Sequence, residues 1–280
     1  MSGVKDNSLF QMLFVQEFFF RCNPTANRNP FWALASEPDE LRVKNSVAEG
    51  LEDLHTRKRN AEKIYSPGHP IRKTTLVEYR EAEGDETLRV TPNNVNISHA
   101  DMSTLRAKQW LTDNVIAASE FMMSKINPKI YYADPWVSEA LQKLGGINKI
   151  SPKLREEMKR YKQMLVPVNV AETHWALVLV NLTDKTMTFY DSMNTAPEPF
   201  FEMLMPLLNI LDMSGSGQYT TSKAKLAKQE NSFDCGVYMI MFAWCLTAGI
   251  KPPENIDQTV VNNFRTLISL DILDLKPPVP

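Results

Sequence analysis

Cys235 stands where a polar stretch of the chain runs into a long apolar segment. Residues 229–234 are mostly polar, whereas residues 237–246 are apolar and contain no glycine or proline. An apolar run of this length predicts a buried helix that begins close to the cysteine. The positive end of the helix dipole favours the thiolate, which is the nucleophilic form of cysteine. The sequence therefore predicts Cys235 as a candidate nucleophile.

A nucleophilic thiol needs a base to take its proton and a further group to orient that base. His174 begins an almost uniformly apolar run over residues 174–181, which is typical of a strand buried on both faces. Residues 185–190 alternate in polarity and predict a second strand, and Asp191 follows it directly. A hairpin places the start of one strand beside the end of the next. We therefore expect Asp191 to accept a hydrogen bond from the imidazole of His174.

Gln229 precedes the cysteine by six residues and carries a side-chain amide. Together with the backbone N–H of Cys235, this amide could stabilise the oxyanion that forms when a thiolate attacks a carbonyl. Cys22 and Cys245, the other two cysteines, are predicted to be small hydrophobic residues of the interior.

The elements that must position these residues follow from hydrophobic periodicity and from capping signals. Helices are predicted at residues 113–126, 135–144, 198–211, 235–248 and 256–270, and strands at residues 164–170, 174–181, 185–190 and 219–221. The order of helices, then a small and mainly antiparallel sheet, then helices indicates an α+β fold.

The composition excludes several classes of protein. Of the 280 residues, 43% are hydrophobic and 23% are charged, and the net charge of −2 gives no reason to expect nucleic acid or an anionic membrane as a partner. Three scattered cysteines form neither a disulfide framework nor the spacing of a zinc site. We expect a monomer without cofactor or metal, in the nucleus or cytoplasm. The apolar segment 9–20 is too short to span a bilayer.

The chain is predicted to divide near residue 92. Between residues 37 and 90, 22 of the 54 residues are charged and no helical or strand period is sustained. This composition predicts that residues 1–92 form a partly disordered or helical arm of unknown role. Residues 93–280 are predicted to form the compact domain.

Four motifs, in this order, resemble those of the ubiquitin-like-protein protease family, a papain-like group that includes the SUMO-specific (sentrin-specific) proteases and the deneddylases. They are the segment WLTDNVI at residues 110–116, His174-Trp175, Asp191-Ser192, and Gln229 followed by Asp234-Cys235-Gly236. Thr112 stands where the family motif usually has asparagine. The resemblance covers about residues 95–275.

The resemblance implies a papain-like cysteine protease fold, with a small mixed or antiparallel sheet flanked by helices. It implies Cys235 as the nucleophile, His174 as the base, Asp191 as the orienting acid and Gln229 as the oxyanion donor. It also implies two roles in substrate binding. Trp110 and Trp175 would wall a narrow channel for a diglycine tail, and Asp113 would contact the surface of the modifier.

The function implied is a cysteine isopeptidase or peptidase that cleaves after the Gly-Gly terminus of a ubiquitin-like modifier, SUMO before others. A deneddylase or deubiquitinase of the same fold is the close alternative. Two further alternatives are an acyltransferase with a related active site and an inactive modifier-binding module. Each residue alone also has an ordinary structural role; Trp110 and Trp175, for example, could be plain core residues.

Overall fold

The computed structural model describes residues 87–90, 94–143, 145–212 and 217–274, all within the unit Tyr79–Pro280. The expectations for the N-terminal arm up to residue 86 lie outside the described residues.

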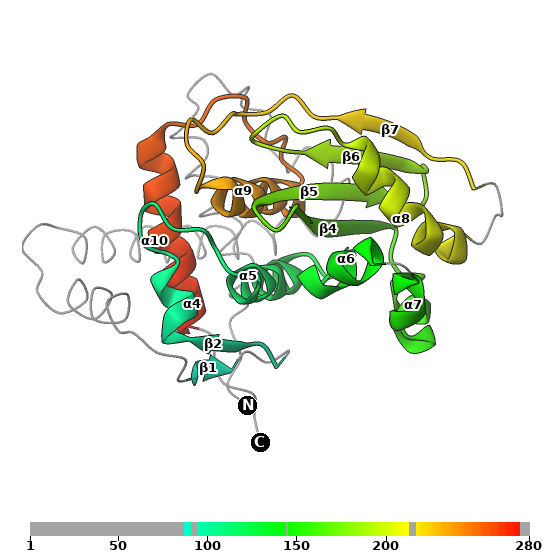
Figure 1. The fold of residues 1–280 in the computed structure, drawn as a ribbon, viewed down its shortest axis with the longest axis horizontal. Helices are drawn as coiled ribbons and strands as arrows, with labels where there is room; N and C mark the ends of the chain where they lie inside the picture. Colours follow the sequence, from blue (N-terminus) through cyan, green and yellow to red (C-terminus); the bar gives the residue numbers. More distant parts are fainter. Residues whose placement is uncertain (1–86, 91–93, 144, 213–216, 275–280) are drawn as a thin grey trace, which may run out of the picture. The chain divides into compact units, whose positions relative to one another are not determined.

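A five-stranded mixed sheet forms the centre of the unit (Figure 1). Its strands, in spatial order, are β3 (Ile130–Tyr132), β4 (Gln163–Val170), β5 (His174–Asn181), β6 (Thr186–Tyr190) and β7 (Thr220–Lys223). The three central strands are antiparallel, and each edge strand runs parallel to its neighbour. The predicted α+β class with a small mixed sheet flanked by helices is confirmed.

One face of the sheet packs on α6 (Pro135–Gln142), α7 (Pro152–Met158) and α8 (Glu198–Leu211). Alternate residues of the central strands meet these helices, because successive side chains of a strand point to opposite faces. Phe189 of β6, for example, is fully buried and stacks on Phe200 of α8 with ring centroids 5.5 Å apart.

Three helices cover the other side of the strands. Helix α9 (Cys235–Thr247) packs against β5 and against α5 (Asp113–Ile126), and α10 (Gln258–Asp274) packs against α9. Leu246 is the one residue of α9 that is not buried. Burial on all sides explains why the helix is apolar throughout its length rather than along one stripe.

A small two-stranded sheet, β1 (Thr87–Val90) and β2 (Asn96–Ser98), precedes this core. Helix α4 (His99–Ser103) follows directly, with Ser98 and Asp101 forming a reciprocal capping box at its start. Strand β1 thus pairs with β2 across the division near residue 92 that the composition predicts.

Helices α5 and α8 and strand β5 have the bounds expected from the sequence. The short elements β3, α7 and the 3-10 helix η2 (Gly146–Lys149) were not expected. A three-residue strand or a helix of four to seven residues carries too few residues for its period to be visible.

Candidate active site

The β5–β6 hairpin brings His174 and Asp191 together. His174 is the first residue of β5, and Asp191 follows the last residue of β6. The imidazole Nε2 lies 2.6 Å from the carboxylate Oδ1, and both side chains are buried. A short hydrogen bond between a buried imidazole and a buried carboxylate fixes the orientation of the ring.

The carboxylate of Asp191 is also held by the turn that follows it. The backbone N–H of Met193 donates to Oδ1 at 2.8 Å, and the N–H and hydroxyl of Thr195 both donate to Oδ2. Burial alone would raise the pKa of Asp191, but the hydrogen bonds from His174 and from these backbone groups outweigh it and lower the pKa. Asp191 is therefore ionised at neutral pH.

His174 has its pKa raised to about 9. Burial of the ring lowers the pKa, and the hydrogen bond to Asp191 together with the proximity of the Cys235 sulfur outweighs that effect. The Nε2 atom of His174 is hydrogen-bonded to Asp191, whereas its Nδ1 atom has no hydrogen-bond partner among the described residues. Nδ1 is thus the nitrogen that remains for the sulfur of Cys235.

Cys235 is the first residue of α9 and is 1% exposed. Its sulfur therefore lies where the helix dipole is positive, beside a histidine that is protonated at neutral pH. Cys245, in the same helix, is inside the core, and burial raises the pKa of its thiol far above the usual range. A buried thiol with a raised pKa is chemically inert.

The loop before Cys235 is held by a buried arginine that the sequence reasoning missed. Arg265 of α10 is 2% exposed, and its guanidinium pairs with the carboxylate of Asp234 at 2.6 Å. It also donates to four backbone carbonyls, those of Thr104, Arg106, Gln109 and Phe233. One side chain thus ties the segment before Trp110 to the segment before Cys235.

A signal for this arginine exists in the sequence. Arg265 lies among the apolar residues Val261, Phe264 and Ile268 at helical spacing, so it occupies the buried face of its helix. A charged residue in an apolar stripe is unusual unless it is paired. The sequence does not reveal the partner, Asp234, because the two residues lie 31 positions apart.

Gln229 is held in place at both ends of its amide. Its carbonyl oxygen accepts from the Ser192 hydroxyl at 2.5 Å, and its Nε2 donates to the Asn231 carbonyl at 2.6 Å. The backbone N–H of Gln229 donates to the Ser192 carbonyl at 3.1 Å. Asn231 in turn accepts from the N–H groups of Phe233 and Asp234. The loop from Gln229 to the cysteine is therefore ordered by its own polar side chains.

The two tryptophans are placed differently. Trp110 is 49% exposed, and its indole N–H donates to the Ser232 carbonyl at 2.8 Å. Trp175 is buried, and its indole N–H donates to the Leu111 carbonyl at 3.1 Å. Each indole is thus bonded to a loop at the site, Trp110 to the loop before Cys235 and Trp175 to the loop that carries Trp110.

Gly236 lets the loop that carries Trp110 approach the start of α9. A Cβ atom at this position would lie 3.0 Å from the Cβ of Leu111, closer than ordinary contacts allow. The absence of a side chain at residue 236 therefore brings the Trp110 segment against the helix that carries the cysteine.

Asp113 lies at the first position of α5 and is exposed. Its carboxylate accepts from the neighbouring N–H of Asn114 and remains accessible to solvent. The buried Asp101 accepts from the Thr112 hydroxyl at 2.7 Å and from the Asn114 amide, which fixes this end of the helix.

Within the described ranges, no three His, Cys, Asp or Glu side chains gather closely enough to hold a metal ion. None of the described helices is both long and apolar enough to cross a membrane.

Comparisons with known proteins agree on one family. Residues 109–275 match the model of the Ulp1 protease family, C-terminal catalytic domain. Ubiquitin-like-specific protease 1 of Saccharomyces cerevisiae is 24% identical over 57% of this chain and 27% of its own length. Human sentrin-specific protease 5 is 24% identical over 76% of this chain and 29% of its own. The chain therefore spans less than a third of the length of these relatives.

The fold has solved counterparts. The C-terminal Ulp1 protease domain, solved in complex with the yeast SUMO ortholog Smt3, has a TM-score of 0.63 and 21% sequence identity. The match covers 72% of this chain and 95% of that domain. A Ulp1-like SUMO protease catalytic domain of Chaetomium thermophilum has a TM-score of 0.61 and 20% identity. The match to the family model covers more than half of the chain, and the chain belongs to the Ulp1 protease family.

Proposed function

We propose that this chain is a cysteine isopeptidase or peptidase that cleaves after the Gly-Gly terminus of a ubiquitin-like modifier, with SUMO as its modifier. The observation that carries this proposal is the buried His174–Asp191 pair beside Cys235 at the start of α9. We assign the reaction to residues 93–280 and no role to residues 1–92. The cysteine usage supports a reducing compartment, the nucleus or cytoplasm.

The names of the relatives support SUMO over the neddylation tag or ubiquitin. The matched relatives are called ubiquitin-like-specific and sentrin-specific proteases, and the matched Ulp1 domain was solved with the yeast SUMO ortholog. An isopeptidase that releases such a modifier acts on the bond between its terminal glycine and a lysine amine.

In the first chemical step, the sulfur of Cys235 attacks the carbonyl carbon of the terminal glycine. With a pKa of about 9, His174 is protonated at neutral pH, so the attacking sulfur lies beside an imidazolium. As the tetrahedral intermediate collapses, His174 gives its proton to the departing amine and a thioester remains. Neutral His174 then takes a proton from water, whose oxygen attacks the thioester and frees the modifier carboxylate and the thiol.

The side-chain amide of Gln229 and the backbone N–H of Cys235 stabilise the oxyanion. One N–H of the Gln229 amide is bonded to Asn231, so the amide carries a second N–H that can donate to the substrate oxygen. The hydrogen bond from Ser192 fixes the orientation of the amide before substrate arrives. A donor that is already oriented stabilises developing charge without reorganisation.

The aromatic residues at the site support selection of a glycine tail. A slot beside Trp110 and Trp175 would admit a Gly-Gly backbone and reject residues with side chains, because glycine alone has none. The exposed carboxylate of Asp113 is free to contact the modifier surface.

The test is a panel of SUMO, neddylation tag and ubiquitin, each with a C-terminal fluorophore and each as a vinyl sulfone. Wild type should cleave the SUMO substrate and form an adduct with the SUMO vinyl sulfone. Cys235→Ala should abolish both, whereas Cys245→Ala should leave the adduct at Cys235. Cleavage of none of the three by wild type would refute the proposal.

Two alternatives give different results in the same assay. An acyltransferase would transfer acetyl from acetyl-CoA to a protein and would not react with the modifier panel. An inactive binding module would bind a modifier without forming an adduct. The paired His174 and Asp191 argue against the inactive module, because a module that only binds needs no oriented base.

A further inference from the structure

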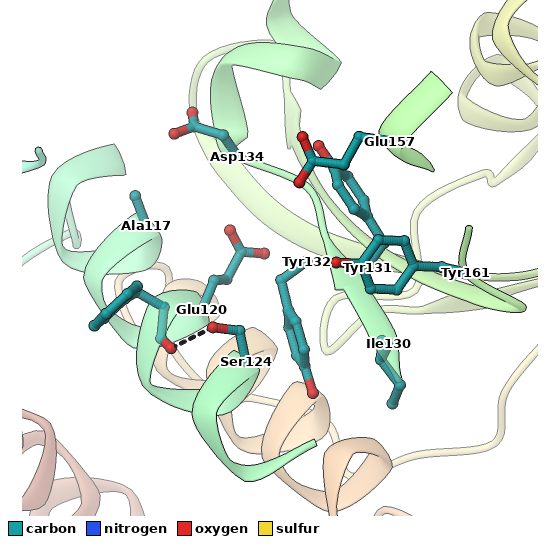
Figure 2. A pocket seen from close by; sticks show the side chains of 10 residues that line it. Ala117, Glu120, Ser124, Ile130, Tyr131, Tyr132, Asp134, Glu157 and Tyr161 are labelled. Atoms are coloured by element: carbon teal, nitrogen blue, oxygen red, sulfur yellow. Dashed lines mark hydrogen bonds between the residues drawn. The ribbon is translucent and has the colours of Figure 1, made fainter. Parts of the chain in front are cut away.

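A pocket of about 280 Å³ lies between α5, β3 and α7, apart from the candidate active site. Acidic and aromatic side chains dominate its lining, and none of them belongs to the candidate active site. The lining includes Glu120, Asp134 and Glu157 together with Tyr131, Tyr132 and Tyr161 (Figure 2).

Glu120 is the unusual residue of this pocket. It projects from α5 into the space between Asp134 and the tyrosines (Figure 2), and it is 4% exposed. Neither of its carboxylate oxygens has a hydrogen-bond partner among the described residues. A buried carboxyl without a partner is costly, so buried acids are normally paired or hydrogen-bonded.

The neighbours of Glu120 do not supply that partner. The Ser124 hydroxyl donates to the Phe121 carbonyl at 2.7 Å, and the Tyr132 hydroxyl donates to Thr247 at 3.0 Å. The Lys125 ammonium lies over the ring of Phe121, 4.6 Å from its centroid, rather than against the carboxylate. These groups are already engaged, so they leave Glu120 without a counter-charge.

The electrostatic environment of Glu120 also indicates that a positive charge is missing beside it. Burial raises the pKa of Glu120, and the negative charge of Asp134 raises it further. The exposed carboxylates of Asp134 and Glu157 line the same pocket. These two exposed carboxylates make the potential of the pocket negative, and a cation that entered it would favour the ionised form of Glu120.

The aromatic lining of the pocket favours an organic cation over a metal ion. Tyr131 and Tyr161 meet edge to face with ring centroids 5.3 Å apart, and Tyr132 lies beside them in the lining. Tyrosine faces attract organic cations, and an ammonium or guanidinium on an aliphatic stem matches a pocket that is both aromatic and acidic. A bare metal ion fits less well, because no three of the described acids lie close enough to share one.

We propose that this pocket binds a single organic cation, the ammonium of a lysine or the guanidinium of an arginine side chain, with Glu120 as its counter-ion. The cation would pair with Glu120 at the bottom of the pocket. Its stem would lie against the rings of Tyr131 and Tyr161, and Asp134 and Glu157 would attract it at the rim. The pocket would then be an anchoring point for a basic segment of a protein.

Two methyl groups of the lining make direct reporters. Ala117 and Ile130 line the pocket, whereas Ala176 lies in the sheet core away from it. The full-length chain, labelled at alanine and isoleucine methyl groups, is titrated at pH 8 with n-butylammonium, n-butylguanidinium and neutral 1-butanol. We expect saturable shifts of Ala117 and Ile130 with at least one cation, and no shift of Ala176. The two cations distinguish an ammonium site from a guanidinium site.

Glu120→Gln keeps the shape of the side chain and removes its charge. It should weaken cation binding at least tenfold, whereas Glu202→Gln, an exposed position on α8, should leave it unchanged. The bound cation should also raise the melting temperature of wild type but not that of Glu120→Gln. Three results overturn the proposal: no shift with either cation, equal shifts with 1-butanol, or undiminished cation binding by Glu120→Gln.

Discussion

His174 is the side chain whose chemistry depends most on its surroundings. In water an imidazole is half protonated near pH 6.5. Here burial alone would favour the neutral ring, and only the carboxylate of Asp191 and the sulfur of Cys235 reverse this effect. The charge state of the proposed catalytic base is thus set by two residues that are 17 and 61 positions away in the sequence.

The first prediction concerns pH. His174 must be protonated to pair with the sulfur, so kcat/KM should fall as pH rises through about 9. Asp191→Asn removes the carboxylate that raises this pKa. The alkaline limb should therefore move down toward the ordinary imidazole value of about 6.5.

The matched control is Asp184→Asn. It removes a carboxylate from the turn at the opposite end of the same hairpin, where Asp184 bonds to Asn181. Its pH profile of kcat/KM should follow that of wild type. An alkaline limb that stays in place in Asp191→Asn would contradict the assignment of Asp191.

The second prediction concerns the oxyanion. Gln229→Ala removes a donor that acts chiefly in the transition state, so kcat should fall by about 10²–10³ with a smaller change in KM. Steady-state kinetics on a modifier–fluorophore substrate measures both constants. Gln142→Ala, an exposed amide on α6, is the control. A kcat within threefold of wild type in Gln229→Ala would remove Gln229 from the mechanism.

Arg265, in addition to the sheet, connects the elements around the site. This side chain of α10 reaches the segment before Trp110 and the segment before Cys235 at once. A guanidinium suits this position because its planar fork of donors can bond several carbonyls and a carboxylate together. The start of α9 is therefore placed by the last described helix of the chain.

The third prediction tests this link. Arg265→Met leaves the carboxylate of Asp234 buried without its partner and should lower the free energy of unfolding by about 3–5 kcal/mol. Arg265→Lys keeps the charge but has fewer donors and should lie between Met and wild type. Urea unfolding, followed by circular dichroism, measures both variants. A loss below about 1 kcal/mol in Arg265→Met would show that the ion pair does not hold these loops.

The whole unit depends on β4 and β5, the strands of the sheet that are buried on both faces. The β5–β6 hairpin carries His174 and Asp191 at one end, and its central residues pack between α8 on one side and α9 on the other. A rigid core of this kind holds catalytic groups at fixed distances. Loops alone hold such groups less precisely.

The fourth prediction concerns this core. Phe189 is fully buried between Phe200 and Phe201, so Phe189→Ala should lower the free energy of unfolding by about 3–5 kcal/mol. Met193→Ala, at a position that is 46% exposed, should change it by less than about 0.5 kcal/mol. Chemical denaturation compares the two. Equal effects would show that the face under α8 is not the core.

Some long elements were predicted with their bounds, whereas several short ones were missed. Helix α8 and strand β5 have the expected bounds because each carries enough residues for its hydrophobic period to be read. Strand β3 has three residues and forms only by parallel pairing with β4, a contact that no local pattern encodes. The pocket of Glu120 was missed for the same reason, since its lining comes from separate parts of the chain.

The sequence by itself determined the hairpin, the buried helix behind Cys235 and the residue types needed for thiol chemistry, because these depend on local period and spacing. Only the tertiary structure decided which nitrogen of His174 faces Asp191, that Arg265 holds the loop before the cysteine, and that Glu120 is buried without a partner. Burial and long-range pairing set the cost of a charge and the direction of a hydrogen bond. Neither is fixed until residues distant in the chain have come together.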